Sequence, residues 1–349
     1  MGFEQDYKNC ILCPRKCGID RTERPGACGV GDRLRVARAA LHFWEEPCIS
    51  GTKGSGTVFF SGCNLGCVYC QNRAISRGQA GREITPERLT EIFFELEARG
   101  ANNINLVTGD HFLPTIAGAV EAAKQRGIGI PFLLNTSSYL CVDTLKRMEG
   151  LIDIYLPDFK YIRDQDAVRY SRAPGYPEAA RAAIAEMVRQ QPECAFTDEA
   201  EEGGEGKKEK HAEGKKENHA EEKKDNHGEG RSGFDPEQKE MTDAKIRVLT
   251  RGVVVRHLLL PGQLIQAKMI VRYLYETYGD RIFISLMSQF TPDHEALAEH
   301  FPELDRKVLG REYRSLVDYA AGLGVTNGFM QEGEAASDSF IPAFDDTGV

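Results

Sequence analysis

The sequence lacks three features that would each assign it to a broad class of proteins. No cluster of lysine and arginine marks a nucleic-acid-binding surface, and no apolar run approaches the length needed to cross a membrane. The first residues, Met1–Asp6, have neither the basic region nor the apolar region of a secretory signal peptide. We therefore expect a cytoplasmic protein that acts on neither nucleic acid nor membranes.

Apolar residues are scarce in one internal segment, residues 198–243. The segment holds 16 acidic and 9 basic residues, a net charge of −7, so only −2 of the chain's −9 is left for all other residues. An eight-residue repeat begins at His211 and again at His219 and contributes almost nothing apolar. Such a segment cannot bury enough surface to offset the entropy lost on ordering. We expect a disordered charged insert whose flanks, 194–197 and 245–249, pair as a small hairpin.

Ten cysteines are present, and seven of them form two groups near the N-terminus. Without a secretory signal, clustered cysteines indicate metal ligands rather than disulfides. One group is Cys63, Cys67 and Cys70, spaced Cys-x3-Cys-x2-Cys directly after a strand-like run. Three thiolates can hold three irons of a 4Fe–4S cluster and leave the fourth iron open for a substrate or cofactor. The alternatives are a chance grouping or a structural zinc knuckle, which would require four ligands.

The other group is Cys10, Cys13, Cys17 and Cys28, four thiols within nineteen residues. Four sulfur atoms can close a tetrahedral zinc site or carry an auxiliary iron–sulfur cluster, and the spacing does not separate these two. Four free thiols in an irregular segment are the alternative. The three scattered cysteines are expected to be ordinary thiols.

From residue 57 onward, short apolar runs alternate with helical stretches, which predicts parallel strands joined by right-handed crossovers. The predicted strands are 57–60, 103–107, 132–135, 152–156, 253–260 and 282–287. The predicted helices are 86–99, 114–126, 142–149, 177–190, 264–278 and 292–300. Six such units predict an α/β fold, a partial (β/α)6 TIM-like barrel, with an N-terminal cysteine-rich metal-binding extension. In barrels the chemistry gathers at the carboxyl ends of the strands, where the cysteine motif lies.

The same pattern predicts the domain organisation. We expect a cysteine-rich extension over 1–50, the barrel over 51–332 with the insert 198–243 inside it, and a flexible tail over 333–349.

The Cys-x3-Cys-x2-Cys motif after a first barrel strand, with Tyr69 before the last cysteine, resembles the radical S-adenosylmethionine (SAM) superfamily. More of the chain resembles one branch of it, the uncharacterised relatives of pyruvate formate-lyase activating enzyme. The stretches that carry this likeness are 10–18, 45–51, 59–64, 105–108, 154–161, 255–262 and 285–289.

The resemblance implies an oxidoreductase chemistry. SAM chelates the open iron, one electron from the reduced 4Fe–4S cluster cleaves it, and the 5′-deoxyadenosyl radical abstracts a hydrogen atom from a substrate. The difficult step belongs to the cofactors, and the protein supplies orientation and a dry cavity. A reduced ferredoxin or flavodoxin is implied as electron donor, and a glycyl-radical enzyme as the protein that an activase of this kind would modify.

The resemblance also assigns a set of SAM-binding residues. Their positions match SAM contacts of the activases, with Thr108-Gly109-Asp110 standing where those have Gly-Gly-Glu and Asn135-Thr136 where they have Asp-Thr. The set is Asn72, Thr108, Gly109, Asn135, Thr136, Asp158, Lys160 and Arg256.

Three of the nearby side chains can be interpreted from the strand pattern. Arg256 lies within an apolar strand, so it needs an anionic partner, either Asp158 or the SAM carboxylate. The neighbouring His257 points to the opposite face and is expected to be structural. His111, at a strand end, is a candidate for the substrate side or an ordinary loop histidine.

Two other functions remain open at this stage. One is a non-catalytic iron–sulfur or zinc protein that carries electrons, which would need no SAM-binding residues. The other is a radical SAM enzyme that acts on a small molecule rather than on a partner protein.

Overall fold

The structure is a computed structural model, and it describes residues 4–78, 80–199, 246–330 and 342–349. From residue 200 to residue 243 the predicted insert lies outside the described residues. The prediction of disorder there is therefore not tested.

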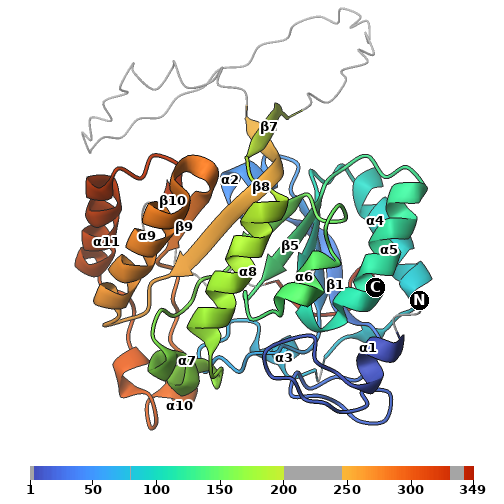
Figure 1. Ribbon diagram of the computed structural model, residues 1–349, viewed down its shortest axis with the longest axis horizontal. Coiled ribbons are helices and arrows are strands. Elements are labelled where there is room, and N and C mark those ends of the chain that lie inside the picture. The colour runs from blue at the N-terminus through green and yellow to red at the C-terminus, as the bar shows by residue number, and fades with distance from the viewer. Residues whose placement is uncertain (1–3, 79, 200–245, 331–341) are drawn as a thin grey trace, which may run out of the picture.

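The strands of the described residues form one open, curved sheet (Figure 1) in the order β10-β9-β8-β6-β5-β4-β2-β1-β3, with β7 paired to β8. All neighbours from β2 to β10 in this order run parallel, whereas β1 is antiparallel to β2 and β3 is antiparallel to β1. The strands are β1 (Arg35–His42), β2 (Ser55–Phe60), β3 (Arg82–Glu83), β4 (Ile104–Val107), β5 (Phe132–Thr136), β6 (Ile154–Pro157), β7 (Ala195–Asp198), β8 (Arg247–Leu258), β9 (Phe283–Met287) and β10 (Gly328–Met330). The predicted partial TIM-like barrel is thus confirmed, and it is open at both edges.

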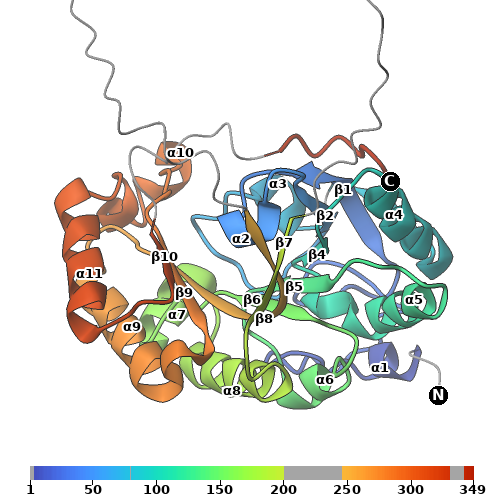
Figure 2. The ribbon, with the colours of Figure 1, turned by 90° about the horizontal axis from the view of Figure 1, so that it is seen from above.

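Most of the helices lie along the convex side of this sheet, so that its concave side is left for a site (Figure 2). They are α4 (Pro86–Ala98), α5 (Leu113–Gln125), α6 (Val142–Lys146), α7 (Asp164–Ser171), α8 (Tyr176–Gln190), α9 (Leu264–Tyr278) and α11 (Gly310–Leu323). The other helices are α1 (Glu4–Lys8), α2 (Pro47–Ser50), α3 (Arg73–Ser76) and α10 (His294–Leu297), with 3-10 turns η1 (Asp110–Phe112), η3 (Gly279–Arg281) and η4 (Pro302–Leu304).

Local sequence explains why these elements form where they do. Strand β2 is buried along its whole length, as expected for a parallel strand covered on both faces. Helix α4 begins with the Thr85 hydroxyl accepting from the Arg88 N–H, and Pro86 occupies its first turn. Its buried face is Leu89, Ile92, Phe93 and Leu96 at helical spacing, and truncating Phe93 alone would cost about 3–5 kcal/mol.

The six predicted strands correspond to β2, β4, β5, β6, β8 and β9, and the predicted hairpin is present as β7 paired antiparallel with the start of β8. Strand β1 was not predicted. It falls within the expected extension 1–50, yet it pairs with β2 from Val36 to His42. The expected tail is described from residue 342 on, and there it lies along β1: Ala39 donates its N–H to the Thr347 carbonyl at 2.8 Å.

The concave face of the sheet is apolar near the amino ends of the strands and polar near their carboxyl ends. Leu133, Ile154, Leu156 and Val254 form one buried cluster with α2, which lies on this inner side (Figure 2). One layer further along, the same strands present Asn135, Asp158 and Arg256. Since a small barrel interior is normally filled with branched apolar side chains, this polar layer indicates a site rather than a packed core.

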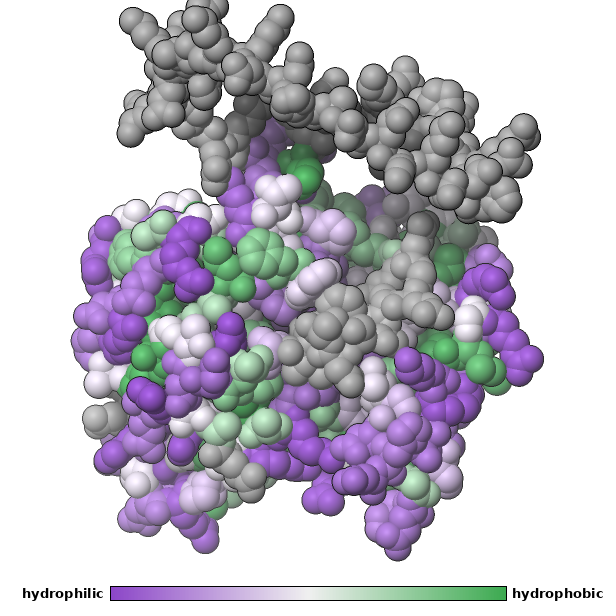
Figure 3. All heavy atoms as spheres, turned by 180° about the vertical axis from the view of Figure 1, so that it is seen from behind, coloured by the Kyte–Doolittle hydropathy of each residue, from purple (hydrophilic) through white to green (hydrophobic). Residues whose placement is uncertain are grey.

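The outer surface mixes hydrophilic and hydrophobic side chains on the face seen from behind (Figure 3). Among the described residues, the helices include none whose length and apolar content would let it span a membrane.

Candidate functional site

A cavity of about 250 Å³ opens at the carboxyl ends of the parallel strands. It collects side chains from loops after β2, β4, β5, β6 and β9 and from β8 itself, which is the expected place for a site in a barrel-like fold. The predicted residues that line it are Cys63, Cys67, Cys70, Asn72, Thr108, Asn135, Thr136, Asp158, Lys160 and Arg256. Residues that are far apart in the sequence are therefore brought to one place.

The three-cysteine motif forms a loop that is held at both of its ends. Cys63 donates its N–H to the Cys28 carbonyl at 3.0 Å. The preceding residue, Gly62, has φ +89°, and a Cβ added there would lie only 2.9 Å from the Cys28 carbonyl oxygen, so this position requires glycine. At the other end, Gly66 and Val68 donate to the carbonyls of Ser171 and Tyr170, the last residues of α7. These bonds satisfy carbonyl groups that a helix end leaves without partners.

All three thiols are partly exposed toward the cavity. Burial raises the pKa of Cys63 well above its usual value and also raises that of Cys70, and in both cases the neighbouring thiols of the motif add to the effect. The thiols therefore lie within electrostatic range of one another. In the part of the chain that the structure describes, however, no three cysteine, histidine, aspartate or glutamate side chains form a ready metal-ligand set.

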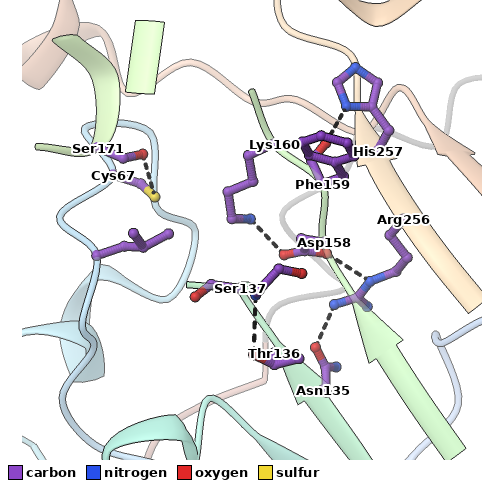
Figure 4. A network of polar contacts seen from close by, with 12 residues as sticks. Cys67, Asn135, Thr136, Ser137, Asp158, Phe159, Lys160, Ser171, Arg256 and His257 are labelled. Carbon is purple, nitrogen blue, oxygen red and sulfur yellow. Dashed lines mark hydrogen bonds and ion pairs between the residues drawn. The ribbon is translucent and has the colours of Figure 1, made fainter. Parts of the chain in front are cut away.

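A chain of hydroxyl groups ends on one of these sulfur atoms. The Ser171 hydroxyl donates to Cys67 Sγ at 2.9 Å (Figure 4), and it lies 2.6 Å from the Tyr161 hydroxyl. Because a hydroxyl carries one hydrogen, Ser171 must accept from Tyr161, which in turn accepts from Tyr69 at 2.6 Å. Such donors around a metal-ligating sulfur tune the charge on that sulfur.

The charged centre of the cavity is Asp158, approached by Lys160 and Arg256 from two sides (Figure 4). Lys160 Nζ donates to Asp158 Oδ2 at 2.6 Å, and Arg256 Nε donates to Asp158 Oδ1 at 2.9 Å. Burial alone would raise the pKa of Asp158, but the two cations outweigh it and hold this pKa below its ordinary value. Conversely, Asp158 raises the pKa of Lys160 against the effect of burial, so both groups carry charge.

A second carboxylate reaches Arg256 from outside the predicted set. Glu45, in the connection from β1 to α2, accepts from Arg256 Nη1 at 3.1 Å and from Asn105 Nδ2 at 3.1 Å. Asn135 also donates to Glu45, at 3.3 Å, and its Oδ1 accepts from Arg256 Nη2. Each of the three nitrogen atoms of the Arg256 guanidinium thus donates to an oxygen atom, which offsets the cost of burying this cation.

Backbone strain marks the ends of two neighbouring strands beside the cavity. Thr108 and Ser138 adopt the left-handed conformation with φ +57° and +62°, which is unfavourable for a residue with a side chain. Strain of this kind persists only where surrounding contacts enforce it, and it gathers at functional sites. Here the Thr108 N–H donates to the Asn135 carbonyl and the Ser138 N–H donates to Thr136 Oγ1.

Three of the residues considered from the sequence lie outside the cavity. Gly109 has a packing role, since a Cβ would lie 2.7 Å from Ile116. His111 is buried with its Nε2 2.9 Å from the Ser61 carbonyl, and burial with the charge of Arg21 lowers its pKa to about 3, so the substrate-side interpretation of His111 finds no support. His257 points away from Arg256 and lies 2.8 Å from the Phe159 carbonyl, as its expected structural role requires (Figure 4).

Several residues of the site were missed in the sequence. They are Glu45, Ser137, Tyr161 and Ser171. A signal existed for the first of them, because Glu45 and Glu46 are adjacent acidic residues directly before Pro47 and at the start of a helix. Ser and Tyr within a strand–helix alternation give no comparable signal.

The residues present fit a 4Fe–4S cluster with SAM. The donor set is three thiols on one loop, facing a cavity that carries an ammonium, a guanidinium and a carboxylate, and the described lining of this cavity adds no fourth thiol or imidazole beside them apart from His42. An amino acid moiety needs both signs of charge, and Lys160 Nζ has three N–H groups, of which Asp158 takes one. Cys63, Cys67 and Cys70 would hold the cluster, and Asn72, Thr108, Asn135, Thr136, Lys160 and Arg256 would surround the cofactor.

Comparison with known proteins gives matches at the levels of sequence and fold. The chain is 29% identical over 177 residues to the uncharacterized protein MJ0674 of Methanocaldococcus jannaschii, an alignment that covers 49% of this chain and 51% of that protein. The match thus spans about half the length of this curated relative.

Solved structures that match part of the chain include SuiB of Streptococcus suis bound to S-adenosylmethionine and the FeFe-hydrogenase maturase HydG of Carboxydothermus hydrogenoformans. The first has a TM-score of 0.42 and 9% identity and covers 78% of this chain and 48% of that one. The second has a TM-score of 0.39 and 13% identity and covers 80% and 58%. Residues 57–196, which contain the three-cysteine loop and the ends of β2, β4, β5 and β6, match the family model of the radical SAM superfamily.

Proposed function

We propose that this protein is a radical SAM enzyme. The observation that carries the proposal is that three thiols with the Cys-x3-Cys-x2-Cys spacing open onto the same cavity as the buried Lys160–Asp158–Arg256 group. An electron carrier or a structural metal site would need no such group. When bound, the cluster and SAM would supply the 5′-deoxyadenosyl radical for hydrogen abstraction.

The chain's own residues would bind and orient the cofactor. Lys160 presents N–H donors to a carboxylate, while Asp158 fixes its position and is itself fixed by Arg256. Asn72 and Thr136 offer polar groups on either side, and Leu65, Val107 and Leu258 supply apolar walls that exclude water from the reacting atoms. A reduced ferredoxin or flavodoxin, the general electron donor of such enzymes, would deliver the electron.

Within this class we propose a glycyl-radical-enzyme activase, in which the hydrogen comes from a glycine of a partner protein. The stretches that resemble the activating enzymes support this role, and two of them, 45–51 and 154–161, contain Glu45 and Asp158 of the site. A small-molecule substrate is the competing target. A glycyl-radical doublet in the electron paramagnetic resonance (EPR) spectrum of a candidate partner, seen only with SAM and the reduced protein, separates the two.

The decisive experiment is anaerobic reconstitution with iron and sulfide, followed by dithionite and SAM. We expect 5′-deoxyadenosine and methionine in equal amounts by chromatography, and we expect Cys67→Ala to abolish both. Cys194→Ser is the matched control, because Cys194 is also partly exposed but lies beside β8 at the other end of the sheet. A protein that holds its cluster and does not cleave SAM, with cell extract added as a substrate source, would refute the enzyme and favour the non-catalytic iron–sulfur protein.

A further inference from the structure

The N-terminal segment before β1 is organised around one buried cation, Arg21. Its side chain is only 1% exposed, and it lies over the rings of Tyr7 and Phe112, with Cζ 4.9 and 5.7 Å from their centroids. Its Nη1 donates to the His111 carbonyl at 2.7 Å and its Nη2 donates to the Gly31 carbonyl. Neither acceptor carries a charge, and among the described residues Arg21 has no ion pair with a carboxylate.

An unpaired buried guanidinium is costly unless an anion lies close to it. Two thiols that can become anions lie next to Arg21. Arg21 Nη1 lies 3.8 Å from Cys10 Sγ, and a Cβ added at Gly26 would lie between the Arg21 side chain, at 3.6 Å, and Cys28 Sγ, at 3.4 Å. Arg21 Nε is buried and has no partner in the described chain.

The other two cysteines of the group, Cys13 and Cys17, lie in the same compact loop segment. Cys10 donates its N–H to the Ile19 carbonyl and accepts from the Gly18 N–H, both at 3.0 Å, which folds Cys13 and Cys17 back toward it. Lys16 donates to the Cys13 carbonyl at 2.9 Å and closes the turn between these two cysteines.

We propose that Cys10, Cys13, Cys17 and Cys28 bind a thiophilic metal centre, a zinc ion or an iron–sulfur cluster, with Arg21 as its buried counter-cation. Zinc with four thiolates and an oxidised 4Fe–4S cluster with four thiolates both carry a net charge of −2, which gives the guanidinium its missing anion. Since these thiols do not form a ready ligand set in the structure, their side chains turn toward one another as the metal displaces the thiol protons into solvent.

This centre would also brace the catalytic loop, an extension that rests on the proposed function. Cys28 accepts directly from the N–H of Cys63, and Arg15 Nε donates to the Asn64 carbonyl at 2.6 Å. Arg21 holds His111, whose ring contacts the Ser61 carbonyl. Three contacts thus join the four-cysteine segment to residues 61–64, where the three-cysteine loop begins.

The test is a metal count on full-length protein in which Cys63, Cys67 and Cys70 are all replaced by alanine. Purified anaerobically, this variant should retain one centre per chain: one zinc without sulfide, or iron with matching acid-labile sulfide and visible absorption. Adding Cys13→Ser and Cys17→Ser should remove it, whereas adding Cys194→Ser should not. A triple variant without metal, or a quintuple variant that keeps it, would overturn the proposal, and neither result depends on SAM cleavage.

Two further measurements keep the proposal testable if the quintuple variant folds poorly. Arg21→Gln in the triple-alanine background should weaken metal retention against a chelator about tenfold, as expected for loss of a group that supports the ligands. Cys141→Ala should leave retention unchanged, although Cys141 donates its N–H to the Leu12 carbonyl near the group. Unchanged metal retention in Arg21→Gln would refute the role of Arg21 as counter-cation. Loss of metal in Cys141→Ala would show that the assigned set of ligands is wrong.

Discussion

The two cysteine groups of this chain lie next to each other, yet they sit in opposite environments. The three-cysteine loop opens onto a cavity lined by charged groups of both signs, and its buried sulfur partner is the neutral hydroxyl of Ser171. The four-cysteine group instead has the cation Arg21 as its buried partner. An open position beside a cavity suits an exchangeable ligand, whereas four ligands and a fixed counter-charge suit a permanent centre.

The same contrast holds for how charge is balanced in the two regions. Beside the cavity, Lys160 and Arg256 are paired with the carboxylates of Asp158 and Glu45. Around Arg21 the described residues supply carbonyl groups, aromatic faces and the Cys10 thiol, but no ion pair with a carboxylate. The charges beside the cavity are thus paired within the protein, and a zwitterionic ligand would bind next to them. The charge of Arg21 would be balanced only when the proposed metal centre forms beside it.

Replacing Arg256, which is paired with Asp158 and Glu45 beside the cavity, should have the largest effect on stability. Arg256→Ala leaves Asp158 with Lys160 alone and leaves Glu45 buried without its cation, so we expect a loss of about 3–5 kcal/mol in the free energy of unfolding. Urea denaturation measures it, and isothermal titration of the reconstituted protein with SAM should show no binding.

The matched control for Arg256 lies on the same strand. Arg251→Ala removes an exposed arginine of β8 and should change stability by less than about 0.5 kcal/mol. If Arg256→Ala were as mild as this control, the Lys160–Asp158–Arg256 group would not be a strongly coupled charge centre.

The second-largest effect on stability is expected for Arg21, beside the four-cysteine group. Arg21→Met keeps the side-chain volume over Tyr7 and Phe112 but leaves two buried carbonyls without donors, which should cost about 2–4 kcal/mol. The loss should be larger in metal-loaded protein than after chelation, because the metal centre supplies the anion. Thermal unfolding of both forms measures it, with the exposed Arg24→Met as control. Equal losses in both forms would separate Arg21 from the metal.

The sequence predicted the parallel part of the sheet because buried strands leave a local pattern. The positions expected to bind SAM came from the resemblance to the activating enzymes, and seven of those eight line one cavity. Strand β1 was missed because its alanine-rich sequence has little β propensity. Glu45 and Ser171 were missed for another reason: Glu45 meets Arg256 across 211 positions of sequence and Ser171 meets Cys67 across 104, so no local signal links them.

A smaller effect should appear as a change in the pH dependence of stability. Burial raises the pKa of Asp110 to about 6, so between about pH 4 and pH 6 the folded state keeps a proton that the unfolded state has lost. Stability therefore falls as pH rises through this window and stays lower above it. Asp110→Asn removes the effect and should be more stable than the wild type by about 1–3 kcal/mol at pH 8, with little difference at pH 4.

Denaturation in urea at several pH values tests the sign of this effect. The control is the exposed Asp318→Asn, which makes the same change of charge at the surface. An Asp110→Asn variant that is less stable than the wild type at pH 8, with the difference vanishing as pH falls, would show that the folded protein favours ionised Asp110, held by Ser137 and its neighbours.

The smallest effect on stability concerns the neutral partner of the three-cysteine loop. Ser171→Ala removes the hydroxyl that donates to Cys67 Sγ and leaves the Tyr161 hydroxyl without its acceptor, a cost of about 1 kcal/mol. The cluster should respond more clearly than the fold, because fewer donors to a ligating sulfur leave more negative charge on it and lower the reduction potential. EPR-monitored redox titration measures the shift, and Tyr161→Phe, one hydroxyl further away, should shift the potential less in the same direction. A rise in potential, or a larger shift in Tyr161→Phe, would show that the hydroxyl chain does not act through Cys67.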